Sequence, residues 1–174
     1  MNESLTRRLP YLFTALLVIA VDRATKTMVE SSLSPWRSVS IVPGLFDLTY
    51  VRNPGGVFGI LKNLDDGVRG ILFTVVPVTA IVLIGAYAWR IPAARRVTQT
   101  SLALILGGAL GNLIDRFRYG HVIDFLDFYW GTHHWPAFNV ADSAICVGVA
   151  VLMLETLFTG EGVSSIHAPR GDAP

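Results

Sequence analysis

Asp124 and Asp142 are the residues whose type and position best fit catalytic chemistry in this sequence. Both lie in a polar stretch, 107–142, that separates two strongly apolar segments. Two carboxyl groups held close together cannot both ionise easily, so one keeps its proton while the other stays charged. The charged group can take a proton from water, and the protonated group can donate to a carbonyl oxygen. The pair therefore predicts an aspartic-type peptide hydrolysis that needs no metal, cysteine or serine.

Further polar residues flank the pair, namely Asp115 and Arg116 before it and Asn139 shortly before Asp142. Polar groups cost free energy near hydrocarbon, so their gathering at the rim of an apolar segment indicates a functional site. A structural role is the alternative for each of them. Asp115 and Arg116 can anchor a helix end, and Asn139 or Asp142 can cap a helix N-terminus, where both residue types are favoured.

A metal site is a second hypothesis for the same stretch. Its candidate ligands are His121, Asp124, Asp127, His133 and His134. The two adjacent histidine rings normally diverge, and the His-Glu-x-x-His spacing of a helical zinc site does not occur. His121 and Asp124 could share an ion only if that stretch were helical. The aspartyl interpretation is therefore favoured, and no metal is expected.

A proton-coupled transporter is a hypothesis of another class, because the same carboxylates could relay protons. A relay would place acids deep within the apolar segments. Asp22, Asp115 and Asp142 instead lie toward one end of their segments, while Glu155 lies toward the other. This distribution favours a site at the rim. A non-enzymatic assembly factor, for which both aspartates would be dispensable, also stays open.

The composition indicates a membrane protein with one domain. Of the 174 residues, 52% are hydrophobic and only 16% are charged, and the mean hydropathy is +0.50. Soluble domains carry about 25% charged residues. The net charge of +1 leaves no basic surface that would suggest nucleic acid as a partner. The length is that of a single domain, which we place at 1–158, followed by a flexible cytoplasmic tail at 159–174.

Four apolar segments predict an all-α membrane bundle, since about 20 apolar residues span about 30 Å of hydrocarbon. The predicted transmembrane helices lie at about 10–29, 70–89, 97–115 and 141–158. In the first, Asp22 and Lys26 are one helical turn apart and can pair on one face. In the third, Gly107 and Gly111 form a small-xxx-small pattern that lets helices approach closely.

The region between the first two helices is more polar and richer in turn residues. Residues 38–42 and 46–51 are rich in β-branched and aromatic residues, which predicts two short strands. Residues 56–64 carry apolar residues at helical spacing, which is typical of an amphipathic helix at the membrane interface. We expect this sheet and helix, within 36–66, on the outer face of the membrane. The second outer segment, 116–140, is assigned no strand.

The arginines indicate how the helices are oriented. Arg7 and Arg8 precede the first helix, and further arginines lie in the short loop 90–96. Basic residues in short loops favour the cytoplasmic side of a membrane. Both termini are therefore expected in the cytoplasm, and the Asp124–Asp142 site is expected near the outer leaflet.

Five motifs resemble those of the lipoprotein signal peptidases, the signal peptidase II family, in their order and spacing. They are VDRATK at 21–26, VRNPGGVFGI at 51–60, GGALGNLIDR at 107–116, GHVIDF at 120–125 and FNVADSAI at 138–145. The resemblance covers roughly residues 10–158. The segment NPGGVFG departs from the family, which often has alanines after the glycine, and this puts the local loop shape in doubt rather than the chemistry.

The resemblance implies an aspartic endopeptidase of the bacterial inner membrane that cuts prolipoproteins before their diacylglyceryl-modified cysteine. By motif, Asp124 and Asp142 match the catalytic pair. The residues that match the substrate pocket are Asn53, Gly108, Asn112, Arg116 and Asn139. Asp22 and Lys26 match the first-helix motif, with a structural or positioning role that we also expect of Asp115. The expected partners are lipidated prolipoproteins and membrane lipids, with no cofactor and a monomeric enzyme.

Overall fold

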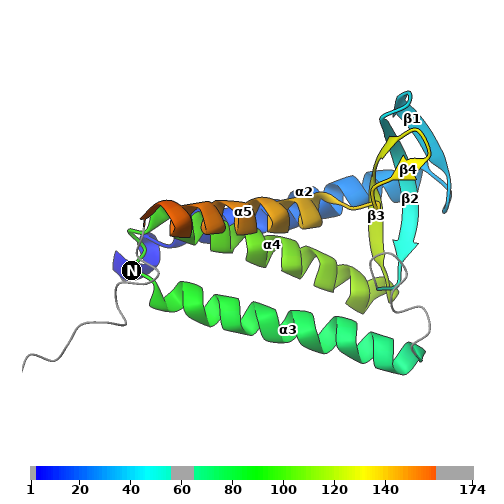
Figure 1. The fold of residues 1–174 in the computed structure, drawn as a ribbon. Coiled ribbons are helices and arrows are strands. Elements are labelled where there is room, and N and C mark those ends of the chain that lie inside the picture. The colour runs from blue at the N-terminus through cyan, green and yellow to red at the C-terminus, as the bar shows by residue number, and fades with distance from the viewer. Residues whose placement is uncertain (1–2, 56–64, 160–174) are drawn as a thin grey trace, which may run out of the picture.

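The computed structural model describes residues 3–55 and 65–159. Four long helices form a bundle, and a small sheet stands across one end of it (Figure 1). In chain order the elements are α1 (Glu3–Thr6), α2 (Leu9–Ser32), β1 (Ser38–Val42), β2 (Phe46–Asn53), α3 (Asp66–Arg90), α4 (Arg96–Tyr119), β3 (Val122–Trp130), β4 (His133–His134) and α5 (Val140–Thr159). The predicted interfacial helix at 56–64 and the tail from residue 160 lie outside the described residues.

Each predicted transmembrane segment lies within one of the long helices. Three stretches are long and apolar enough to cross a membrane, namely Gly70–Arg90, Arg96–Tyr119 and Val140–Phe158. The remaining helix, α2, is as long, but its second half carries the charged residues Asp22, Arg23, Lys26 and Glu30. By length and composition the described part of the chain has three candidate spans, and the fourth stays a prediction.

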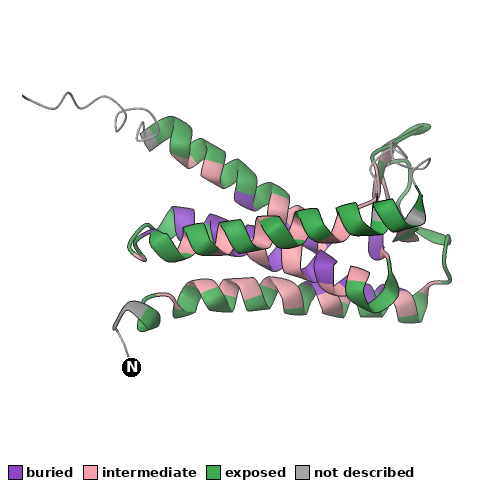
Figure 2. Cartoon of the chain, turned by 90° about the horizontal axis from the view of Figure 1, so that it is seen from below, coloured by how far each residue is buried: buried purple, intermediate pink, exposed green. Residues whose placement is uncertain are grey.

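Glycines of α4 allow α2 and α5 to approach this helix closely. A Cβ atom at Gly107 would lie 2.8 Å from the Ala15 carbonyl oxygen of α2. One at Gly108 would lie 2.3 Å from the Ala141 carbonyl oxygen of α5. A real Cβ does not tolerate such distances, so the close packing predicted for this segment is confirmed. Figure 2 shows the result, with buried residues where the helices meet and exposed residues on their outward faces.

The sheet is antiparallel, with the strand order β1-β2-β3-β4. β1 coincides with its predicted strand, and β2 extends two residues beyond the other. The absence of a strand from 116–140 was a wrong prediction, because β3 and β4 lie there. β3 has the β-branched and aromatic residues of a strand, but Asp124 and Asp127 interrupt its apolar pattern. Asp124 pairs with Val51 of β2 and is thus held by the sheet rather than by a loop.

A small hydrophobic core joins the sheet to the bundle. It contains Val29 of α2, Tyr50 of β2, and Ile123 and Phe125 of β3, none of them more than 4% exposed. Ile123 and Phe125 flank Asp124 and share one face of their strand, since side chains alternate along a strand. A shift of β3 by one residue would expose this core. The core therefore fixes the face on which Asp124 lies.

Candidate active site

Asp142 is fixed at the start of α5 by reciprocal hydrogen bonds with Asn139. The Asp142 backbone N–H donates to Asn139 Oδ1 at 2.9 Å, and the Asn139 backbone N–H donates to Asp142 Oδ2 at 3.2 Å. This arrangement is a capping box, in which each side chain satisfies a backbone donor of the other residue. It holds the Asp142 carboxylate in the first turn of a helix, where a negative charge is favoured.

Asp124 is only 2% exposed, and each of its carboxylate oxygens accepts a hydrogen bond from an amide. Asn139 Nδ2 donates to Oδ1 at 2.7 Å, and Asn53 Nδ2 donates to Oδ2 at 2.9 Å. Asn139 thus contacts Asp124 through its amide nitrogen and Asp142 through its amide oxygen and its backbone. The structure brings the two predicted aspartates together around this one asparagine.

The protonation of Asp124 is set by opposing influences. Burial raises the pKa of Asp124 to about 6, and the neighbouring Asp142 raises it too. The hydrogen bonds from Asn53 and Asn139 and the charge of Lys26 lower this pKa, but burial is the larger effect. A carboxyl group with a pKa near neutrality can hold a proton and release it during a reaction, which is what general acid catalysis requires.

Three asparagines present their NH2 groups to the carboxylates because another donor occupies each amide oxygen. The donors are the Gly55 N–H to Asn53 Oδ1 at 2.9 Å, the Lys26 ammonium to Asn112 Oδ1 at 3.1 Å and the Asp142 N–H to Asn139 Oδ1 at 2.9 Å. An ammonium or a backbone N–H can only donate, so the facing amide atom must be the oxygen. The other side of each amide then donates, as Asn112 Nδ2 does to Asp142 Oδ1 at 2.7 Å.

A buried cluster of charges from α2 and α4 lies behind the aspartates. Asp22, Lys26 and Asp115 have no exposed side-chain surface. Lys26 Nζ lies 2.7 Å from a carboxylate oxygen of Asp22 and 2.7 Å from one of Asp115, and Asp115 also pairs with Arg23. The predicted pairing of Asp22 with Lys26 is confirmed. The two negative charges of this cluster are thus matched by the two positive charges of Lys26 and Arg23. The third hydrogen bond of Lys26 goes to Asn112 Oδ1 and orients that amide.

Asp22 and Asp115 also hold in place the two elements, α5 and β3, that carry Asp142 and Asp124. Asp22 Oδ1 accepts a hydrogen bond from the Ala141 backbone N–H of α5 at 3.0 Å. Asp115 Oδ2 accepts one from the Ile123 backbone N–H of β3 at 3.4 Å. Each of these backbone groups belongs to the residue directly before one of the two aspartates. The positioning role expected of Asp22 and Asp115 therefore has a definite geometry.

Arg116 lies near Asp124 and Asp142, and one of its guanidinium nitrogens has no hydrogen-bond partner among the described residues. Its Nη1 lies 3.5 Å from the Asn112 carbonyl oxygen, and its guanidinium carbon lies 5.7 Å from the centre of the Phe73 ring. Its buried Nε has no hydrogen-bond acceptor among residues 3–55 and 65–159. An unpaired buried donor costs about 1–3 kcal/mol, so a carbonyl oxygen of a bound ligand would be stabilised there. Gly108 was predicted to line the same pocket as Arg116. In the structure it packs against Ala141 of α5.

Sequence reasoning missed Arg23, which pairs with Asp115 and whose guanidinium carbon lies 5.6 Å from the centre of the Tyr119 ring. The signal was present, because a charged residue within an apolar helix usually has a buried partner. Spacing within α2 indicates the pairing of Asp22 with Lys26, whereas the partner of Arg23 lies on α4 and no spacing within one helix indicates it.

The histidines of the outer segment lie apart from the aspartate pair. His134 Nδ1 lies 3.0 Å from the carboxylate of Asp127, on an exposed part of the sheet. His121 lies against the ring of Tyr119. Among the described residues, no three His, Cys, Asp or Glu side chains are grouped so that they could hold a metal ion.

A bundle of apolar helices that holds two aspartates on one shared asparagine, beside a small sheet, fits the class of membrane-embedded aspartic proteases. Comparison with known proteins identifies the family. The profile described as Signal peptidase (SPase) II matches residues 14–158, and the chain belongs to the signal peptidase II family.

Relatives and solved structures agree with this assignment. The chain is 50% identical to the lipoprotein signal peptidase of Geobacter metallireducens over 139 residues, which cover 80% of this chain and 85% of that one. It is 44% identical to that of Moorella thermoacetica over 149 residues, which cover 86% and 93%. A solved bacterial membrane enzyme superposes with a TM-score of 0.77 at 25% identity, covering 91% of this chain and 94% of the other. These similarities give no support to the transporter hypothesis.

Proposed function

We propose that Asp124 and Asp142 are the catalytic pair with which this enzyme removes signal peptides from prolipoproteins, cutting before the lipidated cysteine. The removal of signal peptides follows from membership of the lipoprotein signal peptidase family. The observation that carries the assignment of the pair is the position of Asn139, which hydrogen-bonds to both aspartates. The two carboxyl groups are thereby held near each other by one shared hydrogen-bonding partner.

The two aspartates have different roles in this proposal. Asp142, in the first turn of α5 and hydrogen-bonded to two N–H donors, is the charged partner and takes a proton from the attacking water. Asp124, with a pKa of about 6, is the acid and donates to the carbonyl oxygen of the scissile bond. The C–N bond of the tetrahedral intermediate then breaks as Asp142 passes the proton it took from water to the leaving amine, and Asp124 recovers its proton from a hydroxyl of the intermediate.

The surrounding residues divide between orientation of the pair and contact with substrate. Asn112 and Asn139 direct their NH2 groups at the carboxylates, so we assign them the orientation of the pair. Arg116, with its unpaired Nε, binds a substrate carbonyl. Asn53 links Asp124 to the end of β2, and its amide oxygen accepts a hydrogen bond from the Gly55 N–H, so we assign it a place at the edge of the substrate pocket. Gly108, also predicted to line the substrate pocket, packs against α5. Its missing side chain lets the helix that carries Asp142 lie close to α4.

We further propose that α2 is the fourth transmembrane helix. Its first half is apolar and its outward side chains are exposed, among them Leu12, Phe13 and Leu16. The charged Asp22 and Lys26 are fully buried against α4, so they would not face lipid. With four spans both termini lie on the same side, and the arginines at that end assign this side to the cytoplasm. We therefore propose that the aspartate pair lies near the outer leaflet of the inner membrane. We expect the enzyme to act as a monomer.

The test of the pair is the cleavage of a purified prolipoprotein by Asp124→Asn and Asp142→Asn variants. General acid–base catalysis contributes about 10²–10⁴-fold to a rate, so each substitution should lower kcat by at least that factor while the variant still folds. Asp127→Asn is the matched control, because Asp127 lies on the same strand and pairs with His134 instead. A variant of Asp124 or Asp142 that keeps more than about a tenth of the activity would refute the assignment.

The substrate assignment has a separate test. Purified enzyme is given the same prolipoprotein with and without its diacylglyceryl group. Processing of the lipidated form alone is the expected result, and equal processing of both forms would refute the specificity. Activity should also persist in a strong chelator, whereas loss that added zinc restores would revive the metal hypothesis.

A further inference from the structure

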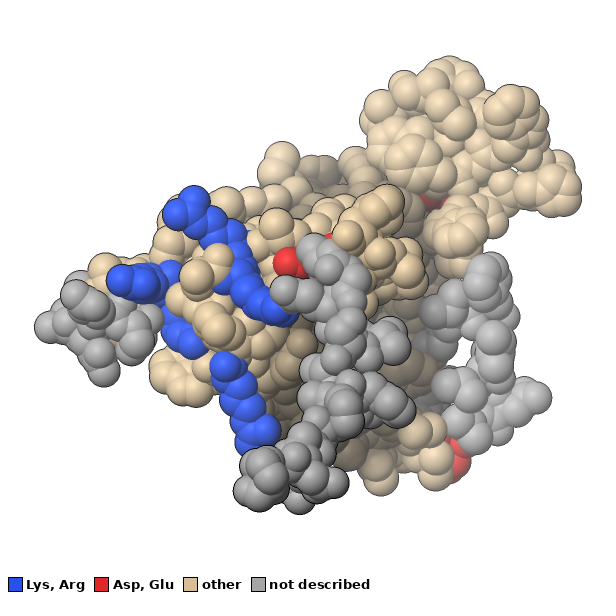
Figure 3. Space-filling view, turned by 60° about the vertical axis from the view of Figure 1, so that its left-hand side comes forward, with Lys and Arg blue, Asp and Glu red and all other residues tan. Residues whose placement is uncertain are grey.

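The end of the bundle away from the sheet carries a concentration of arginines. Figure 3 shows this end obliquely, with basic side chains gathered over the start of α2 and the loop between α3 and α4. The arginines in these segments are Arg7, Arg8, Arg90, Arg95 and Arg96. Among the described residues, neither Arg7 nor Arg96 forms an ion pair with a carboxylate. This end therefore offers positive charge to an anion from outside the chain.

A cavity of about 650 Å³ opens beside two of these arginines. Arg7 and Arg96 line it, together with Pro10 and Tyr11 from the first turn of α2 and Thr100 of α4. Neither helix has a side-chain hydrogen bond at its N-cap. The N-terminus of a helix attracts anions through its free N–H groups and its dipole. Pro10 has no N–H, and the N–H groups of Tyr11 and Arg96 donate to backbone carbonyl oxygens. The two arginine side chains and the positive ends of the two helix dipoles, rather than free N–H groups, therefore fit a phosphate group at this cavity.

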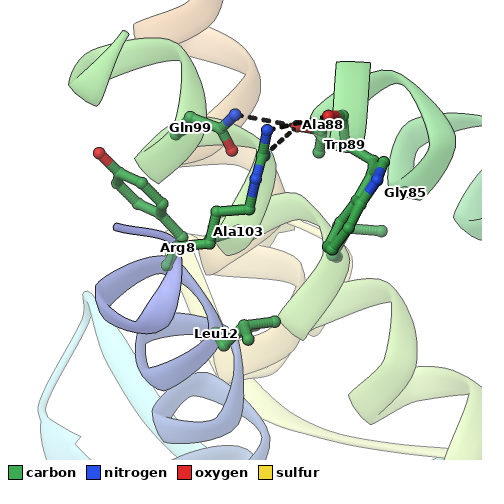
Figure 4. Close-up of a pocket in the computed structure, with 10 residues that line it drawn as sticks. Arg8, Leu12, Gly85, Ala88, Trp89, Gln99 and Ala103 are labelled. Carbon is green, nitrogen blue, oxygen red and sulfur yellow. Dashed lines mark hydrogen bonds between the residues drawn. The ribbon is translucent and has the colours of Figure 1, made fainter. Parts of the chain in front are cut away.

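A second cavity, of about 190 Å³, lies between α2, α3 and α4, and Figure 4 shows the residues that line it. Its walls are largely apolar and include Leu12, Ala103 and the Trp89 ring. Its two strongly polar side chains are already engaged with the end of α3. Arg8 donates to the carbonyl oxygens of Ala88, Trp89 and Ile91, and Gln99 donates to those of Ala88 and Ile91. The interior thus favours an apolar occupant.

The two cavities share Tyr11 as a common wall. The Tyr11 hydroxyl donates to the Ala93 carbonyl oxygen at 2.8 Å, which fixes the ring where the basic and the apolar cavity adjoin. We propose that these cavities form a binding site for an anionic phospholipid. The phosphate lies beside Arg7 and Arg96, and part of one acyl chain enters the space between the helices.

The charge and the shape of the site both point to a lipid rather than to a soluble anion. Basic pockets between membrane helices bind anionic head groups, and each surface arginine contributes about a fivefold gain in affinity for them. The apolar cavity adds a compartment that a free phosphate would leave empty. The site lies at the opposite end of the bundle from the aspartates, so it binds lipid independently of the substrate.

The probe is phosphatidylglycerol added to the purified full-length enzyme in a neutral detergent, with the apparent Tm as the readout. A ligand present at about 100 times its Kd should raise Tm by about 5–10 °C in a protein of this size. Phosphatidylcholine with the same acyl chains and free glycerol phosphate are the comparison ligands. Each should give a much smaller shift. An equal shift with phosphatidylcholine would overturn the role of the arginines, and an equal shift with glycerol phosphate would overturn the role of the acyl chain.

Matched variants test each compartment. Arg7→Gln combined with Arg96→Gln should weaken phosphatidylglycerol binding about 30-fold, whereas Arg37→Gln with Arg118→Gln, which removes the same charge at the other end, should not. Unchanged binding by the Arg7 and Arg96 variant would refute the site.

Gly85 lines the apolar cavity, and a Cβ there would meet no atom within 4 Å. Gly85→Leu should therefore fill the cavity and abolish the Tm shift without a steric clash. Gly70→Leu is the control, because Gly70 lies on the same helix with equally open surroundings but away from the cavity. Peptidase activity of each variant verifies its fold. A full Tm shift in Gly85→Leu would refute the entry of the acyl chain.

Discussion

Lys26→Met removes a buried cation and leaves its three partners in place. Methionine is similar in length and unbranched, so the change removes the charge with little change in volume. The substitution takes a hydrogen-bond donor from Asp22, from Asp115 and from Asn112, at distances of 2.7, 2.7 and 3.1 Å. Asp115 keeps Arg23, whereas Asp22 keeps only the Ala141 N–H among the donors of the described residues.

The loss of one partner from a buried ion pair destabilises a protein by about 3–5 kcal/mol. Each kcal/mol lowers Tm by about 2–4 °C at this chain length, so we expect Tm to fall by about 6–20 °C. The cost arises mainly from the uncompensated carboxylate of Asp22. Asp22→Asn combined with Lys26→Met removes that charge and should recover a substantial part of the loss.

The assay is thermal unfolding of the purified variants in one detergent at one scan rate, followed by tryptophan fluorescence. Arg37→Met is the control, because Arg37 is exposed and should change stability by no more than about 0.5 kcal/mol. A Tm for Lys26→Met within 2 °C of the parent (roughly 1 kcal/mol) would refute the reasoning, as would a double variant less stable than Lys26→Met. Activity measured well below Tm gives a second readout. Asn112 would be free to turn, so kcat should fall more than KM changes.

The remaining predictions concern the pH profile and the helix packing. In Asn53→Ala, the carboxyl of Asp124 loses a hydrogen bond that stabilises its charged form, so its pKa rises above about 6. The alkaline limb of the kcat/KM profile should then move to higher pH. A shift to lower pH would contradict the assignment of Asp124 as the acid. Gly108→Ala would force a Cβ to within 2.3 Å of the Ala141 carbonyl oxygen and should cost about 1–3 kcal/mol of stability. Gly85→Ala, in open surroundings, should be neutral or stabilising by up to about 1 kcal/mol, and similar Tm values for the two alanine variants would refute the packing argument.

The sequence predicted the helices because each apolar run is a local signal of sufficient length. It also predicted the meeting of Asp124 and Asp142, since an antiparallel helix pair brings the outer ends of its members together. It did not predict β3, because the strand is recognised mainly by its pairing with β2, about 70 residues earlier in the chain. Such non-local pairing leaves only a weak pattern, which the aspartates of β3 interrupt further.

The roles of the asparagines also required the structure. As residue types, Asn112 and Asn139 fit a substrate pocket equally well. Only the three-dimensional arrangement shows that Lys26 and the Asp142 N–H occupy their amide oxygens and thereby turn both NH2 groups toward carboxylates. Hydrogen-bond direction depends on neighbours from other helices, and no spacing within one segment encodes it.

The hydrogen bond from the Ala141 N–H to Asp22 has a consequence for the synthesis of the enzyme. It connects residues 119 positions apart, one in the first long helix and one at the start of the last. The ribosome makes Asp124 before it makes Asn139 and Asp142, so a chain that ends before α5 has one aspartate without its partner. With Asp124 and Asp142 as the proposed catalytic pair, proteolytic activity begins only when the final helix has been inserted beside α2 and α4. On this proposal, incomplete chains in the membrane are unable to cut the signal peptides around them.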